Sequence, residues 1–431
     1  MKFIDFFAGI GGFRRGMELE GHECVGFCEF DKFAVASYTS MHLITQEQRE
    51  FLSKMPLKQR QKEILKEEYR NGEWYANDIR RVYAGDIPKA DCWCFGFPCQ
   101  DISVAGKQLG FQGNRSSLFF RVMYLIGQLE EENRPTYLFI ENVKNLLSIN
   151  GGWDFARLLI EMEQRGYDAE WQVLNSKDFG VPQNRERCFI IGHLRGRGSA
   201  EVFPVERADR EDNIQIIGHR DGYRRNTQVF APDGITETLD TGQDRHGAGI
   251  ELIGVIDPQG RKAKCVTPKG EVPTLRSQSH GNEPNVCIKV AEATKQGYSE
   301  CRVGIDSVNL SVPGSKTRRG RVGRDVANTL DTSCNQGIFV QVSEELTVYA
   351  TWYEKYQCYI AIRRLTPKEC FRLQGWTDDY FEKAEFVNSD SQLYKQAGNG
   401  VTVNVIRAIA EKLGERDGYT KSRTLQRQNG A

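Results

Sequence analysis

Residues 2–13 read KFIDFFAGIGGF, which predicts a strand, a glycine-rich turn and the start of a helix. The apolar run Lys2–Ala8 has the character of a buried strand, and the amphipathic stretch Phe13–Glu20 follows the glycines. Glycines at such a corner let the backbone approach a ligand closely at the carboxyl edge of a sheet. A dinucleotide fingerprint starting at Gly9 would need its third glycine where Arg14 stands. A nicotinamide or flavin site is therefore disfavoured.

The same alternation of strand and helix continues over about 190 residues, which predicts an α/β fold with a parallel sheet covered by helices on both faces. Further strands are expected at Glu23–Phe30, Asp91–Phe97, Tyr137–Val143, Glu170–Leu174 and Arg187–Leu194. Within this region residues 43–82, most clearly Gln46–Arg81, are charged and helical in character. We interpret them as a helical insertion.

The composition of the chain limits the classes of protein to which it can belong. The chain has 431 residues, with 58 lysines and arginines against 58 aspartates and glutamates, so any nucleic-acid site must be a local patch. No apolar run reaches the roughly 18 residues of a membrane span. The 12 cysteines are irregularly spaced and no signal peptide is evident, which predicts reduced thiols and a cytoplasmic protein.

Composition changes after Gly196, where Gly, Thr, Asp, Asn and Arg become frequent and no long helical period is found. Three Thr-Leu pairs, at Thr238, Thr274 and Thr329, each precede a β-type run. Their spacings of 36 and 55 residues are unequal, which argues against a solenoid and for a small, irregular β-domain. We expect a first domain at 1–200, a mostly β domain at 201–348, and a return to the first domain at 349–431.

Two acidic residues are expected at strand ends near the glycine turn. Glu29 ends the second strand and could hold ribose hydroxyls, and Asp86 in Gly85-Asp86-Ile87 could accept from an adenine amino group. Together with the glycine turn they predict an adenosine-containing ligand without a pyrophosphate.

A cysteine follows a strand and a proline in Gly96-Phe97-Pro98-Cys99-Gln100, which would hold Cys99 at the sheet edge. A thiolate is intrinsically nucleophilic and suits addition to an electron-poor ring. The alternative is a buried structural thiol, the commoner fate of cysteine. Nearby Cys92 and Cys94 alternate with an apolar residue and have no Cys-x-x-Cys or histidine partners, so we expect no metal site.

Taken in order along nearly the whole chain, these residues resemble the DNA cytosine-5 methyltransferases. The matching segments are Phe6–Phe13, Pro98–Gln100, Glu141–Val143, Gln183–Arg187, Arg364–Glu369 and Gln396–Val401. One departure is Gly400, where the family more often carries serine. The resemblance implies a Rossmann-like S-adenosylmethionine-dependent methyltransferase sheet with a smaller, mostly β target-recognition domain, and it implies double-stranded DNA as the substrate.

The resemblance also implies the chemistry. The Cys99 thiolate adds to carbon-6 of cytosine, and carbon-5 becomes nucleophilic enough to attack the sulfonium methyl of S-adenosylmethionine. Glu141 would supply a proton or hydrogen bond at ring nitrogen-3, and Asn142 would orient Glu141. Arg185 and Arg187 would hold the exocyclic oxygen and help fix the cysteine. The base must first be flipped out of the duplex, at a cost of a few kcal/mol. The implied catalytic residues are Cys99, Gln100, Glu141, Asn142, Arg185 and Arg187.

Binding residues follow from the same comparison. The implied cofactor contacts are Phe6, Ala8, Gly9, Gly11, Gly12, Phe13, Glu29, Phe30, Asp86, Ile87, Pro98, Asn399 and Val401. A glycine-containing loop from Ser103 to Ser117 would close over the DNA, and a basic cluster lies further on. The expected DNA contacts are Ser103, Lys107, Arg115, Arg318, Arg319 and Arg321. The alternatives are a plain surface loop and a solvated charged face.

Two alternative functions are methylation of tRNA and non-catalytic binding of DNA. The tRNA-methylating branch of the same family shares the chemistry, but its Cys-Phe-Thr signature is missing and the long insert favours DNA. A non-catalytic, cofactor-sensing DNA binder would not require Cys99, Glu141 and Arg187 together. We expect a monomer, and the resemblance implies a cognate restriction endonuclease encoded nearby as a candidate partner.

Overall fold

The computed structural model describes residues 1–97, 117–197, 201–206, 216–219, 228–230, 287–311, 319–342, 351–353 and 358–416. The chain forms two compact units. The first comprises Met1–Val181, Arg185–Ala208 and Phe371–Ala431, and the second comprises Pro182–Asn184 and Asp209–Cys370. Among the described residues, no helix combines the length and the apolar character that crossing a membrane requires.

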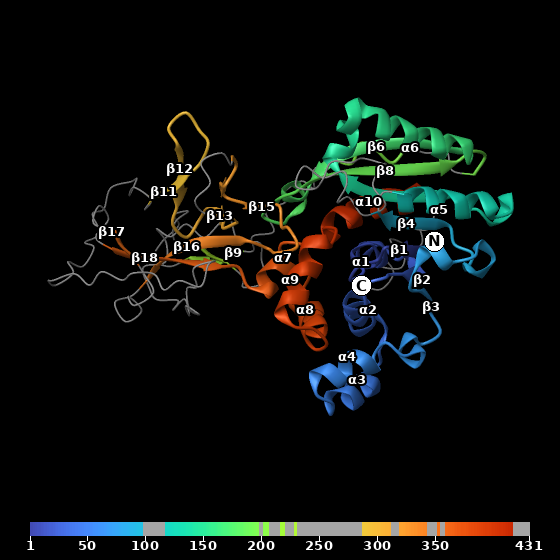
Figure 1. Ribbon diagram of the computed structural model, residues 1–431, viewed down its shortest axis with the longest axis horizontal. Helices are drawn as coiled ribbons and strands as arrows, with labels where there is room; N and C mark the ends of the chain where they lie inside the picture. Colours follow the sequence, from blue (N-terminus) through green and yellow to red (C-terminus); the bar gives the residue numbers. More distant parts are fainter. Residues whose placement is uncertain are drawn as a thin grey trace. The chain divides into compact units, whose positions relative to one another are not determined.

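A seven-stranded sheet forms the centre of the first unit, in the order β3-β2-β1-β4-β5-β8-β6 (Figure 1). Its strands are β1 (Lys2–Phe6), β2 (Glu23–Cys28), β3 (Trp74–Ala76), β4 (Cys92–Gly96), β5 (Tyr137–Val143), β6 (Tyr167–Asn175) and β8 (Glu186–Leu194). Every pair from β3 to β5 is parallel, but β8 runs antiparallel to both β5 and β6. The predicted α/β class is confirmed. The expectation of an all-parallel sheet is wrong at β8, because residues 176–185 are too few for a crossover helix.

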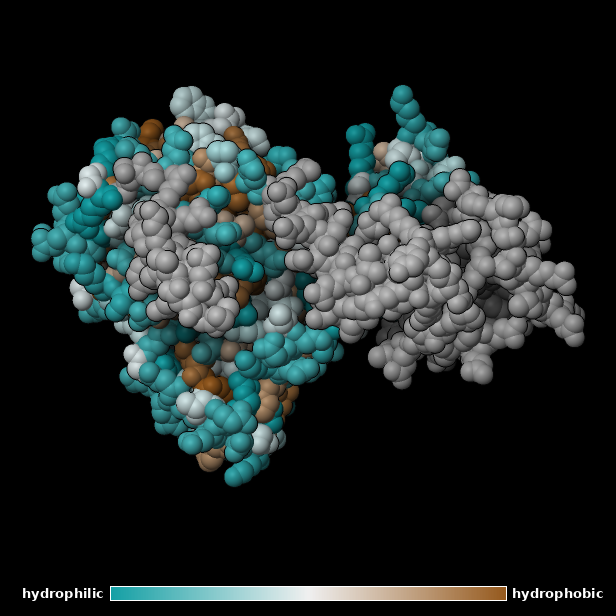
Figure 2. Space-filling model, turned by 180° about the vertical axis from the view of Figure 1, so that it is seen from behind, coloured by the Kyte–Doolittle hydropathy of each residue, from teal (hydrophilic) through white to brown (hydrophobic). Residues whose placement is uncertain are grey.

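Helices cover both faces of this sheet. Helices α1 (Gly12–Leu19) and α10 (Val403–Arg416) share one core with the strands, through Phe13, Met17 and Ile406 among others. On the other face α5 (Ser117–Gln128) and α6 (Trp153–Gln164) contribute Phe119 and Leu158 to a second core. On the side shown in Figure 2, the described surface is mostly hydrophilic, with small apolar patches.

The charged segment between β2 and β4 contains two short helices, α3 (Gln46–Ser53) and α4 (Leu57–Glu63). A capping box starts α3: Thr45 Oγ1 accepts from the Gln48 amide at 3.2 Å, and Gln48 Oε1 accepts from the Thr45 amide at 2.9 Å. The same segment also supplies β3, the edge strand of the main sheet. The segment is therefore more than a helical insertion.

The other helical elements of the first unit are short. They are α2 (Lys32–Tyr38), the π-helix η1 (Thr39–Leu43), α8 (Asp378–Glu385), α9 (Asp390–Asn399), and the 3-10 helices η2 (Glu67–Arg70), η3 (Ile79–Arg81), η4 (Ala84–Asp86), η6 (Glu131–Asn133), η7 (Lys144–Leu147), η8 (Ile149–Gly152) and η9 (Ser176–Phe179). The second unit ends at Cys370, which lies within helix α7 (Pro367–Arg372).

The second unit consists of small β-sheets, the largest in the order β14-β13-β16-β18-β17. Its strands are β7 (Gln183–Asn184), β9 (Ile216–His219), β10 (Gln228–Phe230), β11 (Cys287–Ala291), β12 (Tyr298–Arg302), β13 (Ser307–Asn309), β14 (Val322–Gly323), β15 (Ala327–Asn328), β16 (Gln336–Val342), β17 (Thr351–Tyr353) and β18 (Cys358–Arg364). Strand β18 pairs with β16, so the second unit extends to Cys370 rather than ending near 348. Of the three Thr-Leu pairs, the one at Thr329 follows β15, and the other two lie outside the described residues.

Candidate active site

The predicted glycine turn joins β1 to α1. Gly9 and Gly11 adopt left-handed backbone conformations, with φ of 56° and 84°, and the Gly11 amide donates to the Ala8 carbonyl at 2.8 Å. A Cβ placed on Gly12 would lie 2.6 Å from Cγ2 of Val401. The absence of a side chain at Gly12 therefore lets the segment around Val401 lie directly against the first turn of α1.

Glu29 follows β2 and braces the glycine turn. Its Oε2 accepts from the Gly9 amide at 2.8 Å, and its Oε1 accepts from the Asp31 amide at 2.7 Å. Burial raises the pKa of the Glu29 carboxyl. The next residue, Phe30, is 72% exposed although it is a large aromatic residue. An exposed ring thus lies beside a partly buried carboxyl group after the end of β2.

The expectation that Asp86 ends a strand is wrong. Asp86 lies in the 3-10 helix η4 and is exposed, whereas Ile87 is buried in the core. The acid that follows a strand is Asp78, two residues after β3, and it is 9% exposed. Asp78 accepts from Arg80 Nε at 2.9 Å and Arg80 Nη2 at 2.8 Å, and these bonds lower the pKa of the Asp78 carboxyl.

Sequence reasoning missed Asp78 because β3 is three residues long and stands in a charged stretch. The apolar run Trp74–Ala76 was the available signal. Strand β3 pairs with β2, so its carboxyl end falls at the same sheet edge as Glu29. The Glu29 and Asp78 carboxyls both act electrostatically on the Cys28 thiol, and burial is the main reason that its pKa is raised.

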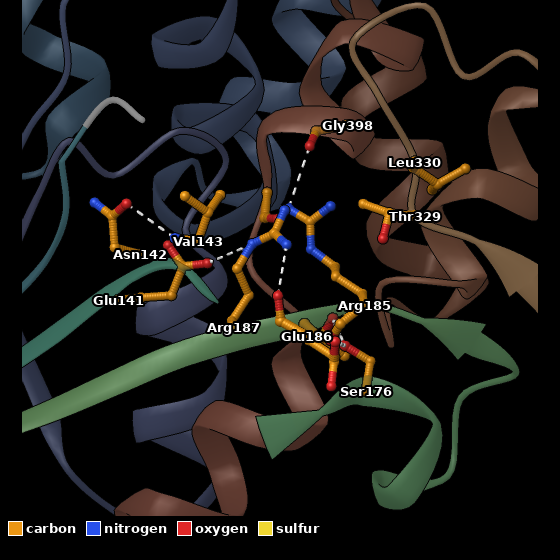
Figure 3. Close-up of polar contacts among 12 residues, drawn as sticks. Glu141, Asn142, Val143, Ser176, Arg185, Glu186, Arg187, Thr329, Leu330 and Gly398 are labelled. Atoms are coloured by element: carbon orange, nitrogen blue, oxygen red, sulfur yellow. Dashed lines mark hydrogen bonds and ion pairs between the residues drawn. The ribbon is translucent and has the colours of Figure 1, made fainter. Parts of the chain in front are cut away.

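Glu141 lies in β5 and forms an ion pair with Arg187 of β8, with 3.1 Å between Oε1 and Nε (Figure 3). Arg187 Nη1 also donates to the backbone carbonyl of Glu186 at 2.8 Å. Glu141 pairs with Gly96 in the parallel register of β5 and β4, and a Cβ on Gly96 would lie 3.1 Å from Glu141 Oε2. The Glu141 carboxylate therefore lies against the end of β4, two residues before Pro98.

Asn142 contacts the same strand end. Its Nδ2 donates to the Phe97 carbonyl at 3.1 Å, and its Oδ1 accepts from the Val143 amide at 2.9 Å. The expectation was that Asn142 orients Glu141. The hydrogen bonds tie Asn142 to Phe97, the residue that precedes Pro98, and its action on Glu141 stays a prediction.

Arg185 differs from Arg187, although the two are only two positions apart. Arg185 is 3% exposed, and its Nη2 donates to the carbonyls of Gly400 at 2.8 Å and Gly398 at 3.3 Å. The side chain therefore holds the turn at the end of α9, next to the exposed Asn399, rather than pairing with Glu141. The contact is to backbone carbonyls, which serine at position 400 would preserve.

The basic cluster of the second unit is only partly described. Arg319 is exposed, but Arg321 is 4% exposed: its amide donates to Glu292 Oε1 at 2.9 Å and its Nη1 donates to the Ala291 carbonyl at 2.9 Å. Arg321 fixes β-structure within the unit, so assigning it to DNA is wrong. Seven predicted site residues lie outside the described residues: Pro98, Cys99, Gln100, Ser103, Lys107, Arg115 and Arg318.

Comparison with solved structures defines the class of fold. The crystal structure of the S. pombe Dnmt2 methyltransferase matches with a TM-score of 0.51 at 14% identity, covering 96% of this chain and 98% of that one. At this identity the match shows a shared methyltransferase fold.

Sequence comparison then identifies the family. The model of the C-5 cytosine-specific DNA methylases matches residues 1–58 and 51–415, so the chain belongs to this family. The orphan methyltransferase M.SPRI of Bacillus phage SPR is 29% identical over 471 residues, covering 96% of this chain and 97% of that protein. The type II methyltransferase M.HhaI of Haemophilus parahaemolyticus is 29% identical over 420 residues, covering 96% and 94%. The prediction of a DNA (cytosine-5-)-methyltransferase is confirmed: the chain methylates carbon-5 of cytosine in DNA.

Proposed function

We propose that the chain transfers the methyl group of S-adenosylmethionine to a flipped-out cytosine in a specific double-stranded DNA sequence, through a covalent bond between Cys99 and carbon-6. The observation that carries the proposal is the Glu141–Arg187 ion pair of 3.1 Å at the end of β4. Cys99 follows this strand end by three residues. The pair therefore lies beside a strand end from which the nucleophile is only three residues away in sequence.

The side chains divide the chemistry as follows. The Cys99 thiolate forms a bond to carbon-6, and Glu141 provides a proton or hydrogen bond to nitrogen-3, which accepts the displaced electron pair. Arg187 holds Glu141 Oε1, while Oε2 remains on the side of Gly96. After methylation, loss of the carbon-5 proton and elimination of the Cys99 thiolate restore the aromatic ring. Asn142 holds the Phe97 carbonyl and so positions the segment that carries Cys99.

The residues around the glycine turn fit an adenosine-containing group. A Cβ on Gly9 would meet no atom of the described part of the chain within 4 Å, which leaves space beside the turn there. The exposed Phe30 ring offers a stacking surface, and the Glu29 and Asp78 carboxyls can accept from hydroxyl or amino groups. We assign S-adenosylmethionine to these residues, and it supplies an electrophilic methyl group when bound.

We assign target recognition to the second unit. Two exposed arginines, Arg319 and Arg324, flank the short strand β14 of its largest sheet and suit phosphate contacts. Ser103, Lys107 and Arg115 remain predicted DNA contacts. Orphan and type II methyltransferases both occur among the relatives, so a companion endonuclease and a monomeric state also remain predictions.

The test is transfer of tritium from methyl-labelled S-adenosylmethionine to a mixture of double-stranded DNA and tRNA. We expect label in DNA alone, and bisulfite sequencing of DNA from expressing cells should show one recurring sequence. DNA with 5-fluorocytosine at that position should trap the protein, because fluorine cannot leave as the proton does. Label in tRNA would contradict the proposal. So would a failure of 5-fluorocytosine DNA to trap the protein when it contains the sequence that the enzyme methylates.

A further inference from the structure

His42 lies on the π-helix η1, which continues α2 by five residues, and its ring reaches the glycine turn. His42 Nε2 lies 2.9 Å from the carbonyl oxygen of Ile10, so Nε2 carries the ring proton and donates it. Ile10 stands between the two left-handed glycines, Gly9 and Gly11. The imidazole therefore binds the peptide group at the centre of the turn.

The turn also packs directly on the His42 ring. A Cβ on Gly11 would lie 2.6 Å from His42 Nε2 and 3.0 Å from Cε2 of Tyr38, so no side chain fits between them. Tyr38 and His42 are four residues apart, and their ring centroids are 4.9 Å apart. A π-helical turn is uncommon and is often found at functional sites. Here it places two adjacent rings against one turn.

The surroundings keep the imidazole neutral. Burial holds the pKa of His42 well below its usual range, and the nearby Arg14, Arg15 and Lys383 cations lower it further. The second ring nitrogen, Nδ1, is buried and has no hydrogen-bond partner among the described residues. An unpaired buried polar atom is unfavourable. An apolar ring would avoid this cost, so the bond to Ile10 is the contact that calls for a histidine.

The turn is held from two directions. Glu29 accepts from the Gly9 amide at 2.8 Å, and His42 donates to the Ile10 carbonyl at 2.9 Å. Two peptide groups of the turn, Ala8–Gly9 and Ile10–Gly11, are thus fixed by side chains from two different segments of the chain. Two further rings, those of Trp376 and Tyr380, lie near His42 with centroids 6.0 and 5.5 Å away, and among the described residues neither has a hydrogen bond to the turn.

We propose that His42 is a positioning residue of the methyl-donor site: its Nε2–H group fixes the glycine turn in the conformation that binds S-adenosylmethionine. This inference rests on the proposed function, which assigns the cofactor to this turn. It predicts an effect on cofactor affinity with little effect on the chemical step, because among the described residues His42 bonds to the turn and not to Glu141.

The test compares two nearly isosteric variants, His42→Gln and His42→Met, of which the glutamine alone keeps a donor. Trp376→Phe is the matched control, because it changes a ring of the same cluster that does not bond to the turn. We measure the Kd of S-adenosylmethionine by calorimetry, and KM and kcat by tritium transfer to DNA. His42→Met should raise Kd and KM by about three- to tenfold, the effect of one hydrogen bond, with kcat within about twofold. His42→Gln and Trp376→Phe should stay within about twofold of the parent.

Equal Kd values for the glutamine and methionine variants would overturn the inference, as would a loss of kcat at constant KM. Should His42→Met not fold, His42→Phe provides a second donor-free side chain, and cofactor binding at the parent's affinity would again overturn the inference. If the parent itself does not bind S-adenosylmethionine, the proposed function falls and this inference falls with it. If the parent binds and both donor-free variants bind equally well, only the role of His42 is wrong.

Discussion

Arg185 and Arg187 provide a matched pair for separating support of the fold from chemistry. Arg185 is buried and donates to the Gly400 and Gly398 carbonyls at 2.8 and 3.3 Å, whereas Arg187 pairs with Glu141. Methionine keeps most of the apolar stem of either arginine and removes the donors. A hydrogen bond from a charged group contributes about 1.5–3 kcal/mol. Arg185→Met should therefore lower the free energy of unfolding by about 3–5 kcal/mol, the longer bond counting at the low end.

Arg187→Met should affect the chemistry as well as the fold. Its ion pair is largely buried, with side chains 16% and 12% exposed, so removal of one partner should cost about 3 kcal/mol of stability, combined with a large loss of the single-turnover rate of methyl transfer. Urea unfolding followed by tryptophan fluorescence gives the first quantity, and rapid-quench transfer of labelled methyl groups gives the second, scaled to the folded fraction. An Arg185→Met protein of parental stability that lacks transfer activity would refute the assignment of Arg185 to the turn after α9.

Three further predictions follow from the site. Cys99→Ser should abolish methyl transfer while cofactor and DNA binding persist, because an alcohol is scarcely ionised near pH 7; turnover within about tenfold of the parent would contradict the proposed nucleophile. Asp78→Ala should weaken S-adenosylmethionine binding by about 1.5–3 kcal/mol in calorimetry, whereas Asp86→Ala should leave it unchanged; a reversed order would restore the original assignment. Arg324→Gln should reduce the slope of log K for DNA binding against log salt concentration by up to about 0.9. Arg321→Gln should instead lower the unfolding midpoint of the second unit. If the slopes of Arg324→Gln and the parent coincide, Arg324 is a solvated charge without a phosphate contact.

Much of the first unit could be predicted because its strands are apolar and its motifs occur in a fixed order. The glycine turn, Glu29 at the end of β2, and Glu141 on β5 all follow from residues adjacent in sequence. The edge strand β3 could not be predicted, because three residues in a charged stretch are too few to show the alternation of apolar and polar residues that marks a strand. Because the strand was missed, Asp78, which follows it, was not considered as a carboxylate beside Asp86.

The roles of arginines could not be read in the same way. Sequence shows that a residue is charged, but not whether its guanidinium meets solvent or a backbone carbonyl. Arg321 and Arg185 are both buried and both donate to main-chain carbonyls, although their sequence neighbours suggested DNA and the target base. Partners of such side chains are 12 to more than 200 residues away, so only the folded chain brings them together.

Helix α1, near the start of the chain, packs directly against the segment that contains Val401 and Ile406. Gly12 and Gly16 lie one turn apart on α1, and a Cβ on them would lie 2.6 Å from Val401 Cγ2 and 2.5 Å from Ile406 Cγ2. A glycine inside a helix costs about 0.5–1 kcal/mol relative to alanine, so the first turns of α1 would be poorly stabilised alone. Close packing of the C-terminal segment against these glycines offsets that cost. The start of α1, which follows the glycine turn, therefore depends on the segment after residue 400, which packs against it.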